Sequence, residues 1–316
     1  MSASASAPGT AARALLPPEI TVLERGWLSA NNILFTGQRD TAVVDTGYCS
    51  HAAQTVALLQ DGLQGRPLDR ILNTHLHSDH CGGNAALQQA WPAVRTAIPP
   101  GQSVHVRHWD AYALSYIPTG QECPPFQFDT VLEPGSCVLL GDKSWQVHAA
   151  PGHDPHSVVL FEPHARILIS ADALWENGFG VVFPELEGER AFDEVAATLE
   201  VIESLAPQVV IPGHGGVFTD APGALAAARK RLDGFVQHPD KHALYAAKVL
   251  LKYKLLDWQH ISMADLTRWA EATPYFGMLR ERHFADQPQT QWLGSLADAL
   301  VRSGAATRQG QMLHNA

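Results

Sequence analysis

The stretch NTHLHSDHCGG, residues 73–83, holds four side chains that can bind a metal ion within six positions: His75, His77, Asp79 and His80. It continues the apolar run RIL, which predicts a β-strand that ends near His75. Alternate side chains of an extended chain point to the same side, so His75 and His77 can reach one ion. Asp79 and His80 come where the chain must turn into a helix, so they can face a second point in space. The segment therefore offers parts of two metal sites.

Three further candidate ligands stand downstream, each directly after a predicted strand. His153 follows SWQVHAAPG, Asp172 follows RILISA, and His214 follows QVVIPG. Strand ends converge at one edge of a sheet, so these distant residues can meet there. Imidazole nitrogens and carboxylate oxygens suit zinc, and iron or manganese are also compatible. A purely structural metal site is disfavoured, because closed structural sites prefer cysteine.

The elements that must hold these residues follow an α/β plan. Short β-branched runs alternate with helical patterns through the first two thirds of the chain, which indicates packed layers of sheets and helices. Strands are predicted at 20–25, 32–37, 41–47, 70–75, 137–142, 144–153, 157–163, 166–172 and 208–214, and helices at 51–63, 82–91 and 192–206.

With these motifs in place, the chain resembles the metallo-β-lactamase fold superfamily of hydrolases. The seven ligand positions of the family, which begin with the signature HxHxDH, are all filled here in the family order: His75, His77, Asp79, His80, His153, Asp172 and His214. The VVDTG segment, which contains Asp45, matches an early strand-to-turn element of the family. The resemblance covers roughly residues 20 to 220 and is specific, because seven ligands recur in order.

The resemblance implies a four-layer αββα sandwich with a dinuclear metal centre at one edge of two sheets. The ligands carried over from the family divide into two sets that share a bridging Asp172: His75, His77 and His153 in one, Asp79, His80 and His214 in the other. The resemblance also implies two divalent ions that share a hydroxide, which attacks the substrate. Zinc is expected first, and iron or manganese are alternatives. Asp79 and His80 are the catalytic candidates, and Asp79 would also orient or reprotonate the reacting groups.

Four nearby residues are candidates for supporting a ligand or contacting the substrate: Asp45, Tyr48, His156 and Trp175. Asp45 is expected to fix a turn or to support a ligand histidine rather than to bind metal. His156 departs from the family pattern, in which many relatives have a histidine one position later, and a loop-stabilising role is an equal alternative. Trp175 opens the segment WENGFGVVFPEL, whose glycines predict a loop that bends close to the site.

The composition describes a globular protein. Hydrophobic residues make up 46% of the 316 residues and charged residues 17%, with no long apolar run, which excludes a disordered or membrane-spanning chain. Four cysteines without a paired motif argue against a disulfide scaffold. The first 20 residues lack the pattern of a secretory signal, so we expect a cytoplasmic protein with a loose tail at residues 1–18.

Charge divides the chain into two parts. Residues 1–224 contain 10 Lys and Arg against 24 Asp and Glu, a net −14, whereas residues 225–316 contain 12 against 8, a net +4. We therefore expect a catalytic domain at 19–223 and a second module at 224–316. Helices are predicted in this module at 224–238, 242–258, 262–272 and 293–304, followed by a small hairpin at 303–314 that would make it resemble a winged helix.

Two hypotheses for the substrate differ in their use of this module. In the first, the chain resembles the glyoxalase II and lactonase branch and cleaves a small acyl substrate, a thioester, lactone or ester. The acidic catalytic domain favours it, because a net −14 would repel a polyanion. In the second, the chain is a metal-dependent endoribonuclease, and phosphates are held by basic residues of the module: RKR at 229–231, Lys248, Lys252 and Lys254. A homodimer through the apolar face of 242–258 is also expected, and a membrane partner is not.

Overall fold

The computed structural model describes residues 12–316, so most of the tail predicted at 1–18 lies outside the described residues. The chain forms two compact units. The first contains the chain up to Trp109 and Cys123–Asp233, and the second contains Asp110–Glu122 and Gly234–Ala316. The second unit is therefore built from an internal segment as well as from the C-terminal part of the chain.

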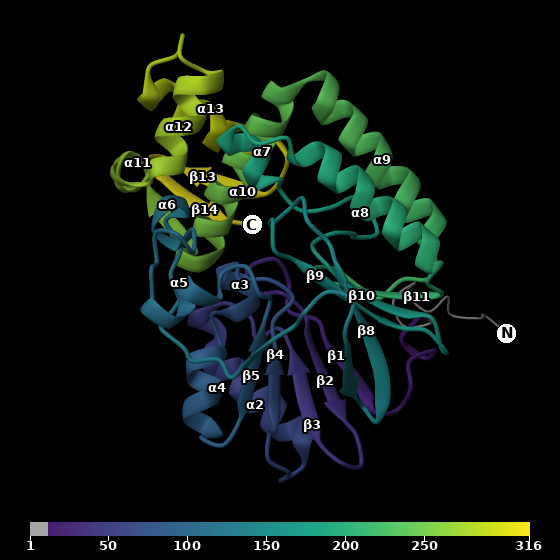
Figure 1. Cartoon of the computed structure of the whole chain (residues 1–316). Helices are drawn as coiled ribbons and strands as arrows, with labels where there is room; N and C mark the ends of the chain where they lie inside the picture. Colours follow the sequence, from purple (N-terminus) through teal and green to yellow (C-terminus); the bar gives the residue numbers. More distant parts are fainter. Residues whose placement is uncertain (1–11) are drawn as a thin grey trace, which may run out of the picture. The chain divides into compact units, whose positions relative to one another are not determined.

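Two β-sheets form the centre of the first unit and face each other in Figure 1. The first sheet has the order β1-β2-β3-β4-β5-β6, with strands Ile20–Leu23, Asn32–Thr36, Thr41–Val44, Arg70–Leu72, Arg95–Ile98 and Thr130–Val131. The second has the order β11-β10-β9-β8-β7, where β7 to β11 are Cys137–Leu140, Lys143–Ala149, Val158–Glu162, Ile167–Ala171 and Val209–Pro212. The pairs β3–β4 and β10–β11 are parallel, so their strands end at the same edge.

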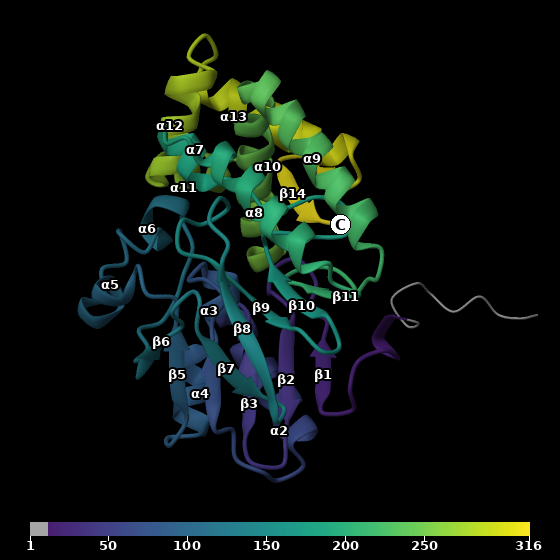
Figure 2. The same ribbon diagram turned by 45° about the vertical axis from the view of Figure 1, so that its right-hand side comes forward.

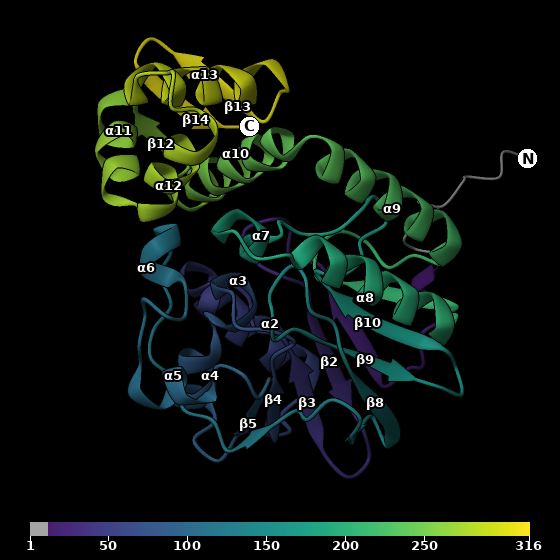
Figure 3. The same cartoon turned by 45° about the horizontal axis from the view of Figure 1, so that its top comes forward.

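Helices cover the outer face of each sheet. The helices of this unit are η1 Cys49–His51, α2 Ala52–Leu63, α3 Ser78–Cys81, α4 Asn84–Ala90, α5 Ser103–His108, α7 Phe183–Glu187, α8 Ala191–Leu205 and α9 Ala221–Gln237, whose last turn belongs to the second unit. Figures 2 and 3 show α2 and α4 on the side of the first sheet and α8 and α9 on the side of the second. The predicted four-layer αββα sandwich is thus confirmed.

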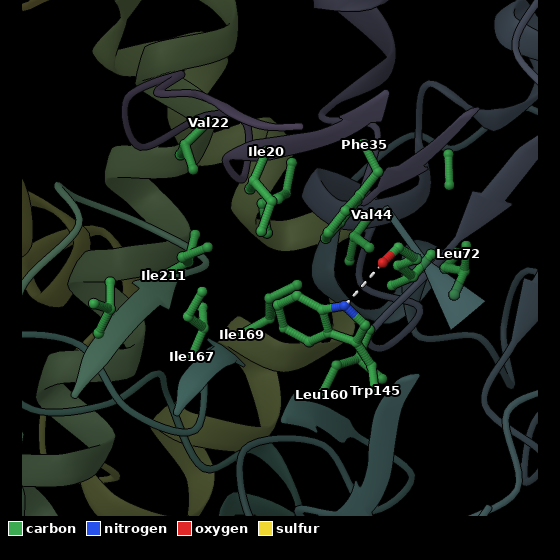
Figure 4. Close-up of a cluster of buried hydrophobic side chains, with 14 of the residues drawn as sticks. Ile20, Val22, Phe35, Val44, Leu72, Trp145, Leu160, Ile167, Ile169 and Ile211 are labelled. Atoms are coloured by element: carbon green, nitrogen blue, oxygen red, sulfur yellow. Dashed lines mark hydrogen bonds between the residues drawn. The ribbon is translucent and has the colours of Figure 1, made fainter. Parts of the chain in front are cut away.

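Central strands of the first sheet are buried on both faces. In β2, Ile33 and Phe35 point into the core between the sheets, whereas Leu34 joins the cluster beneath α2 and α4. The period of two along a strand produces this alternation. Figure 4 shows the core between the sheets, where the fully buried Trp145 packs edge-on against Phe35 and donates its indole N–H to the carbonyl of Leu140 at 3.1 Å.

The second unit is mainly helical, as expected. Its elements are α6 Tyr116–Thr119, α10 Pro239–Trp258, β12 His260–Ser262, α11 Met263–Ala272, α12 Pro274–His283, α13 Gln289–Arg302, β13 Ala306–Gln309 and β14 Met312–Asn315. The predicted hairpin is confirmed as β13–β14, and β12 extends it to a three-stranded sheet. Helix α12 was not predicted, because Gly277 lies inside it and weakens its helical signal. Within residues 12–316, no helix is both long and apolar enough to span a membrane.

Candidate metal centre

Two parallel strands of the first sheet end at the site. Asp45 follows β3, and its backbone N–H donates to the carbonyl of Leu72, the last residue of β4. One oxygen of the Asp45 carboxylate accepts from the Thr74 N–H at 2.9 Å and the other from the Thr74 hydroxyl at 2.8 Å. His75 follows directly. The carboxylate therefore fixes the backbone from which the HxHxDH segment starts.

The second sheet contributes Asp172 after β10 and His214 after β11. The register between these strands shifts next to Ala171, whose φ of 47° lies in the left-handed region. At Gly213 a Cβ atom would lie 2.3 Å from an Asp172 carboxylate oxygen. Only glycine permits this close approach, so Gly213 lets Asp172 and His214 come together.

Hydrogen bonds join the two sheets beside these residues. The backbone N–H of Asn31, before β2, donates to the carbonyl of Gly213 at 2.7 Å, and its side chain donates to that of Pro212 at 3.0 Å. Val158 N–H, at the start of β9, donates to the carbonyl of Thr74 at 2.9 Å. The ligand-bearing loops of the two sheets are therefore held against each other.

Three histidines form the first cluster, which we call cluster A: His75, His77 and His153. The Nδ1 of His77 lies 2.8 Å from Nε2 of His153 and 3.1 Å from Nε2 of His75. Three nitrogen atoms thus converge on one point, with all of them within 4.8 Å of one another. Such a set matches three imidazole ligands of one ion.

Two carboxylates and two histidines form cluster B: Asp79, His80, Asp172 and His214. The Nε2 of His214 lies 3.1 Å from Asp79 Oδ2. One oxygen of Asp172 lies 3.4 Å from His80 Nε2 and 3.8 Å from His214 Nε2, and the other lies 3.4 Å from Nε2 of His153 in cluster A. Asp172 therefore faces both clusters.

The outward nitrogens of the histidines are occupied. Nδ1 of His80 lies 2.8 Å from Asp45 Oδ2, Nδ1 of His214 lies 3.2 Å from the carbonyl oxygen of Gly26, and Nδ1 of His153 contacts the carbonyl of Val181. A carbonyl accepts only from a protonated nitrogen, so in the neutral imidazoles of His153 and His214 the lone pair lies on the inward Nε2. This arrangement is the one that metal-binding histidines adopt.

An orphaned atom in cluster B supports a metal. His80 is fully buried, and its Nε2 has no hydrogen-bond partner among the described residues. A buried polar atom without a partner costs free energy, so such atoms are rare unless an ion, water or ligand satisfies them. Together with the nitrogen and carboxylate donors around it, this atom shows that the residues present fit divalent ions.

Burial and neighbouring charges shift the pKa values of the histidines in opposite directions in the two clusters. Burial, reinforced by the adjacent histidines, holds the pKa of His75 well below its usual range, and burial with His153 lowers the pKa of His77 to about 4. Both imidazoles are therefore neutral at neutral pH, with lone pairs available to an ion.

In cluster B the charges oppose burial. Burial would raise the pKa of Asp172, but His214 and His80 outweigh it and hold that pKa well below its usual range. Burial would lower the pKa of His80, but Asp45 and Asp172 outweigh it and raise that pKa well above its usual range. The pKa of His214 is raised in the same way, against burial, by Asp172 and Asp79. Cluster B therefore keeps its carboxylates ionised.

The remaining sequence candidates occupy different places. Trp175 donates its indole N–H to Asp172 at 3.2 Å. Tyr48 is buried, and its backbone N–H donates to the Ser29 hydroxyl. His156 lies outside both clusters, where its ring packs so closely on Gly101 that a Cβ there would lie 2.1 Å from Nδ1.

Sequence reasoning missed two residues at this site. Trp27 is 56% exposed, and its indole stacks on the His214 imidazole with 5.3 Å between centroids and 12° between planes. Asp154 is buried, with a carboxylate oxygen 3.8 Å from Nε2 of His77. The only sequence signal for Asp154 is its position beside His153, and that for Trp27 is a large apolar residue in a predicted loop.

Comparisons with known proteins identify the family of the chain. A model of the metallo-beta-lactamase superfamily matches residues 25–214, more than half of the chain. The acyl-coenzyme A thioesterase MBLAC2 of Homo sapiens is 26% identical over 211 residues, which cover 60% of this chain and 74% of the relative. The hydroxyacylglutathione hydrolase of Rhodobacter capsulatus is 34% identical over 160 residues, 50% of this chain and 52% of the relative.

Solved structures show the same fold. A beta-lactamase domain protein from Burkholderia ambifaria has a TM-score of 0.58 at 22% identity, with 95% of this chain and 93% of that chain covered. A metallo-beta-lactamase family protein from Thermus thermophilus has a TM-score of 0.55 at 20% identity, with 95% and 99% covered. The resemblance drawn from the sequence is thus confirmed. The chain belongs to the metallo-β-lactamase superfamily and is one of its hydrolases.

Proposed function

We propose that clusters A and B hold two divalent metal ions bridged by Asp172. We also propose that the enzyme hydrolyses a small acyl substrate. A thioester is the substrate that we propose first, and lactones and esters are the alternatives. The observation that supports this most is the position of Asp172, whose two carboxylate oxygens face different clusters. A bridging carboxylate needs this orientation. Zinc is the ion we propose first, and iron or manganese suit the same donors.

The bound ions would supply Lewis acidity, which lowers the pKa of water to roughly 7 and polarises the acyl oxygen. The protein residues orient the reaction. Asp79 keeps 14% of its side chain exposed, more than the other cluster B residues, and its Oδ2 lies 3.1 Å from His214. It is therefore placed to accept a proton from the attacking water and to return it to the leaving sulfur or oxygen. His80, held by Asp45, keeps Asp172 ionised beside it.

Three observations support an acyl substrate. The relatives named above act, by their names, on acyl-coenzyme A and on hydroxyacylglutathione. The exposed Trp27 and the neighbouring Trp175, 5.3 Å apart, give cluster B an apolar border that suits an acyl chain. The net −14 of residues 1–224 disfavours RNA, the substrate of the alternative hypothesis.

The nucleic-acid hypothesis gains no support from the second unit. Lys252 donates its ammonium group to the carbonyl of Ala305 at 2.6 Å. Lys254 is buried, and its ammonium nitrogen lies 3.1 Å from a carboxylate oxygen of Asp257. Two of the lysines predicted to contact phosphates are thus engaged within the unit. A cytoplasmic location and a homodimer through α10 stay predictions.

A hydrolysis panel tests the proposal. Metal-replete protein would be assayed with thioesters, lactones, simple esters, a β-lactam and a labelled single-stranded RNA, and its metal content would be measured. We expect acyl hydrolysis and two ions per chain. The Asp172→Ala variant should lose both, whereas Asp193→Ala, which removes an exposed carboxylate on α8, should retain both. Cleavage of RNA alone, or full turnover by Asp172→Ala, would refute the proposal.

A further inference from the structure

The loop of residues 175–181 contacts three residues of the two clusters. The Trp175 indole N–H donates to the side chain of Asp172, and the Gly180 backbone N–H donates to the carbonyl of Asp172 at 3.0 Å. The Val181 carbonyl accepts from Nδ1 of His153, and the Trp175 ring lies edge-on to His214, 5.6 Å between centroids. One short loop thus orients all the proposed ligands that come from the second sheet.

A tight turn shapes this loop. The Trp175 N–H donates to the carbonyl of Gly178 at 2.6 Å, which closes a tight turn. Gly178 has a φ of 119°, which side chains rarely adopt. The carbonyls of Asn177, inside the turn, and of Phe179, just after it, accept hydrogen bonds from donors on another helix.

Arg231, on α9, supplies these donors. One terminal nitrogen donates to the carbonyl of Phe179 at 2.9 Å and the other donates to that of Asn177 at 2.7 Å. Its guanidinium also lies over the Phe179 ring, 5.9 Å from the centroid. A planar guanidinium can donate to two carbonyls at once, which a lysine ammonium cannot do with the same geometry. A Cβ at Gly178 would lie 2.5 Å from the Arg231 guanidinium carbon, so loop and side chain fit tightly.

Arg229, two residues earlier on the same helix, makes a different contact. Its guanidinium donates to both carboxylate oxygens of Glu203, on α8, at 3.0 and 2.7 Å. Both side chains of this pair are exposed, and the pair joins α8 to α9. Arg229 therefore provides a matched control with the same charge on the same helix.

We propose that Arg231 is a positioning residue of this hydrolase. By holding the loop of residues 175–181, it keeps Asp172, His153 and Trp175 in the geometry that metal binding requires. The inference rests on the proposed function, because it assigns a metal-binding role to Asp172 and His153. It gives the RKR segment a role in the catalytic unit instead of the predicted contact with phosphates.

The test compares Arg231→Ala, Arg231→Lys and Arg229→Ala with the wild type. Amide hydrogen exchange of residues 175–181 is measured in the metal-free proteins, Co²⁺ affinity by titration, and kcat and KM on the thioester that the wild type cleaves. For Arg231→Ala we expect faster exchange confined to the loop, Co²⁺ affinity weaker by about tenfold, and kcat lower by about tenfold at nearly constant KM. For Arg231→Lys, loop exchange, Co²⁺ affinity and kcat should lie between those of Arg231→Ala and the wild type. Arg229→Ala should match the wild type in all three.

Loop exchange and Co²⁺ affinity equal to wild type in Arg231→Ala would overturn the inference, as would equal losses in Arg229→Ala. If Arg231→Ala unfolds, Arg231→Lys decides: faster loop exchange with an unchanged Tm supports the role, and wild-type exchange refutes it. Failure of the proposed function looks different. Wild-type protein that binds no Co²⁺ would refute both the metal centre and the positioning role, whereas metal-replete wild type without acyl hydrolysis would refute only the substrate class.

Discussion

The indole ring of Trp27 lies nearly parallel to the imidazole of His214, with 12° between the planes and 5.3 Å between the centroids. Trp27 is 56% exposed, yet it covers one face of a residue that we place in cluster B. Trp175 meets both rings edge-on. We therefore predict that this exposed aromatic side chain borders the space in which a substrate would bind.

Replacing Trp27 tests this border. Trp27→Ala should raise KM for a thioester by about three- to tenfold, the range expected when one aromatic contact is lost, with a smaller effect on kcat. Trp27→Phe retains a ring and should stay within about twofold of the wild type. Steady-state kinetics across acyl chain lengths, together with metal content, would show whether the loss is confined to binding. An unchanged KM in Trp27→Ala would exclude the tryptophan from the substrate site.

Removing the Asp45 carboxylate should loosen cluster B. Asp45→Ala deprives His80 of its 2.8 Å partner and leaves two Thr74 donors unsatisfied in a buried place. We expect affinity for the second metal ion to fall by about 10- to 100-fold and the free energy of unfolding to fall by about 1–3 kcal/mol. Asp45→Asn still accepts from Thr74, so it should restore stability more than metal affinity. Co²⁺ titration and urea unfolding measure the two effects, and two tightly bound ions in Asp45→Ala would contradict this account.

Gly178→Ala should imitate the loss of Arg231. The added methyl group meets the Arg231 guanidinium and forces a strained φ, so the loop must leave its position. We expect kcat and Co²⁺ affinity to fall without loss of the folded state. Gly135→Ala is the control, because Gly135 also has a positive φ, 87°, but no atom lies within 4 Å of the added Cβ. The Tm of Gly135→Ala should fall by about as much as that of Gly178→Ala, and its activity should equal that of the wild type. Equal kinetics in both variants would argue against the role of the loop.

Acid should destabilise the protein through His242. Burial and the nearby His283 lower the pKa of His242 to about 4, from an ordinary value of about 6.5. Between these values the unfolded chain binds a proton that the folded chain does not. His242 therefore lowers the free energy of unfolding by about 1.4 kcal/mol per pH unit as the pH falls from about 6.5 to 4.

Urea unfolding at several pH values measures this slope. His242→Gln should flatten it, whereas His238→Gln, which changes an exposed histidine nearby in the chain, should leave it as in the wild type. A slope that is unaltered by His242→Gln would assign the acid sensitivity to other groups.

Much of the catalytic unit could be predicted because its signals are local. The short β-branched apolar runs at residues 32–37 and 41–47 predict strands, and the structure has β2 and β3 there. His153, Asp172 and His214 could be chosen because each follows an apolar run. Helix α12 could not be predicted, because a glycine interrupts its helical pattern. The assignment of Asp110–Glu122 to the second unit could not be predicted either, because no local pattern shows that this segment packs with residues 234–316.

The sequence by itself determined which residues could bind metal and the order in which strands deliver them. Ligand type is a property of the side chain, and the alternation of side chains along a strand is a property of the backbone. Only the tertiary structure decided that Trp27 covers His214 and that Arg231 donates to the loop after Asp172. The Trp27–His214 contact joins residues 187 positions apart, and the Arg231 contacts join residues 52 and 54 positions apart. Their geometry depends on how sheets and helices pack, which no local pattern encodes.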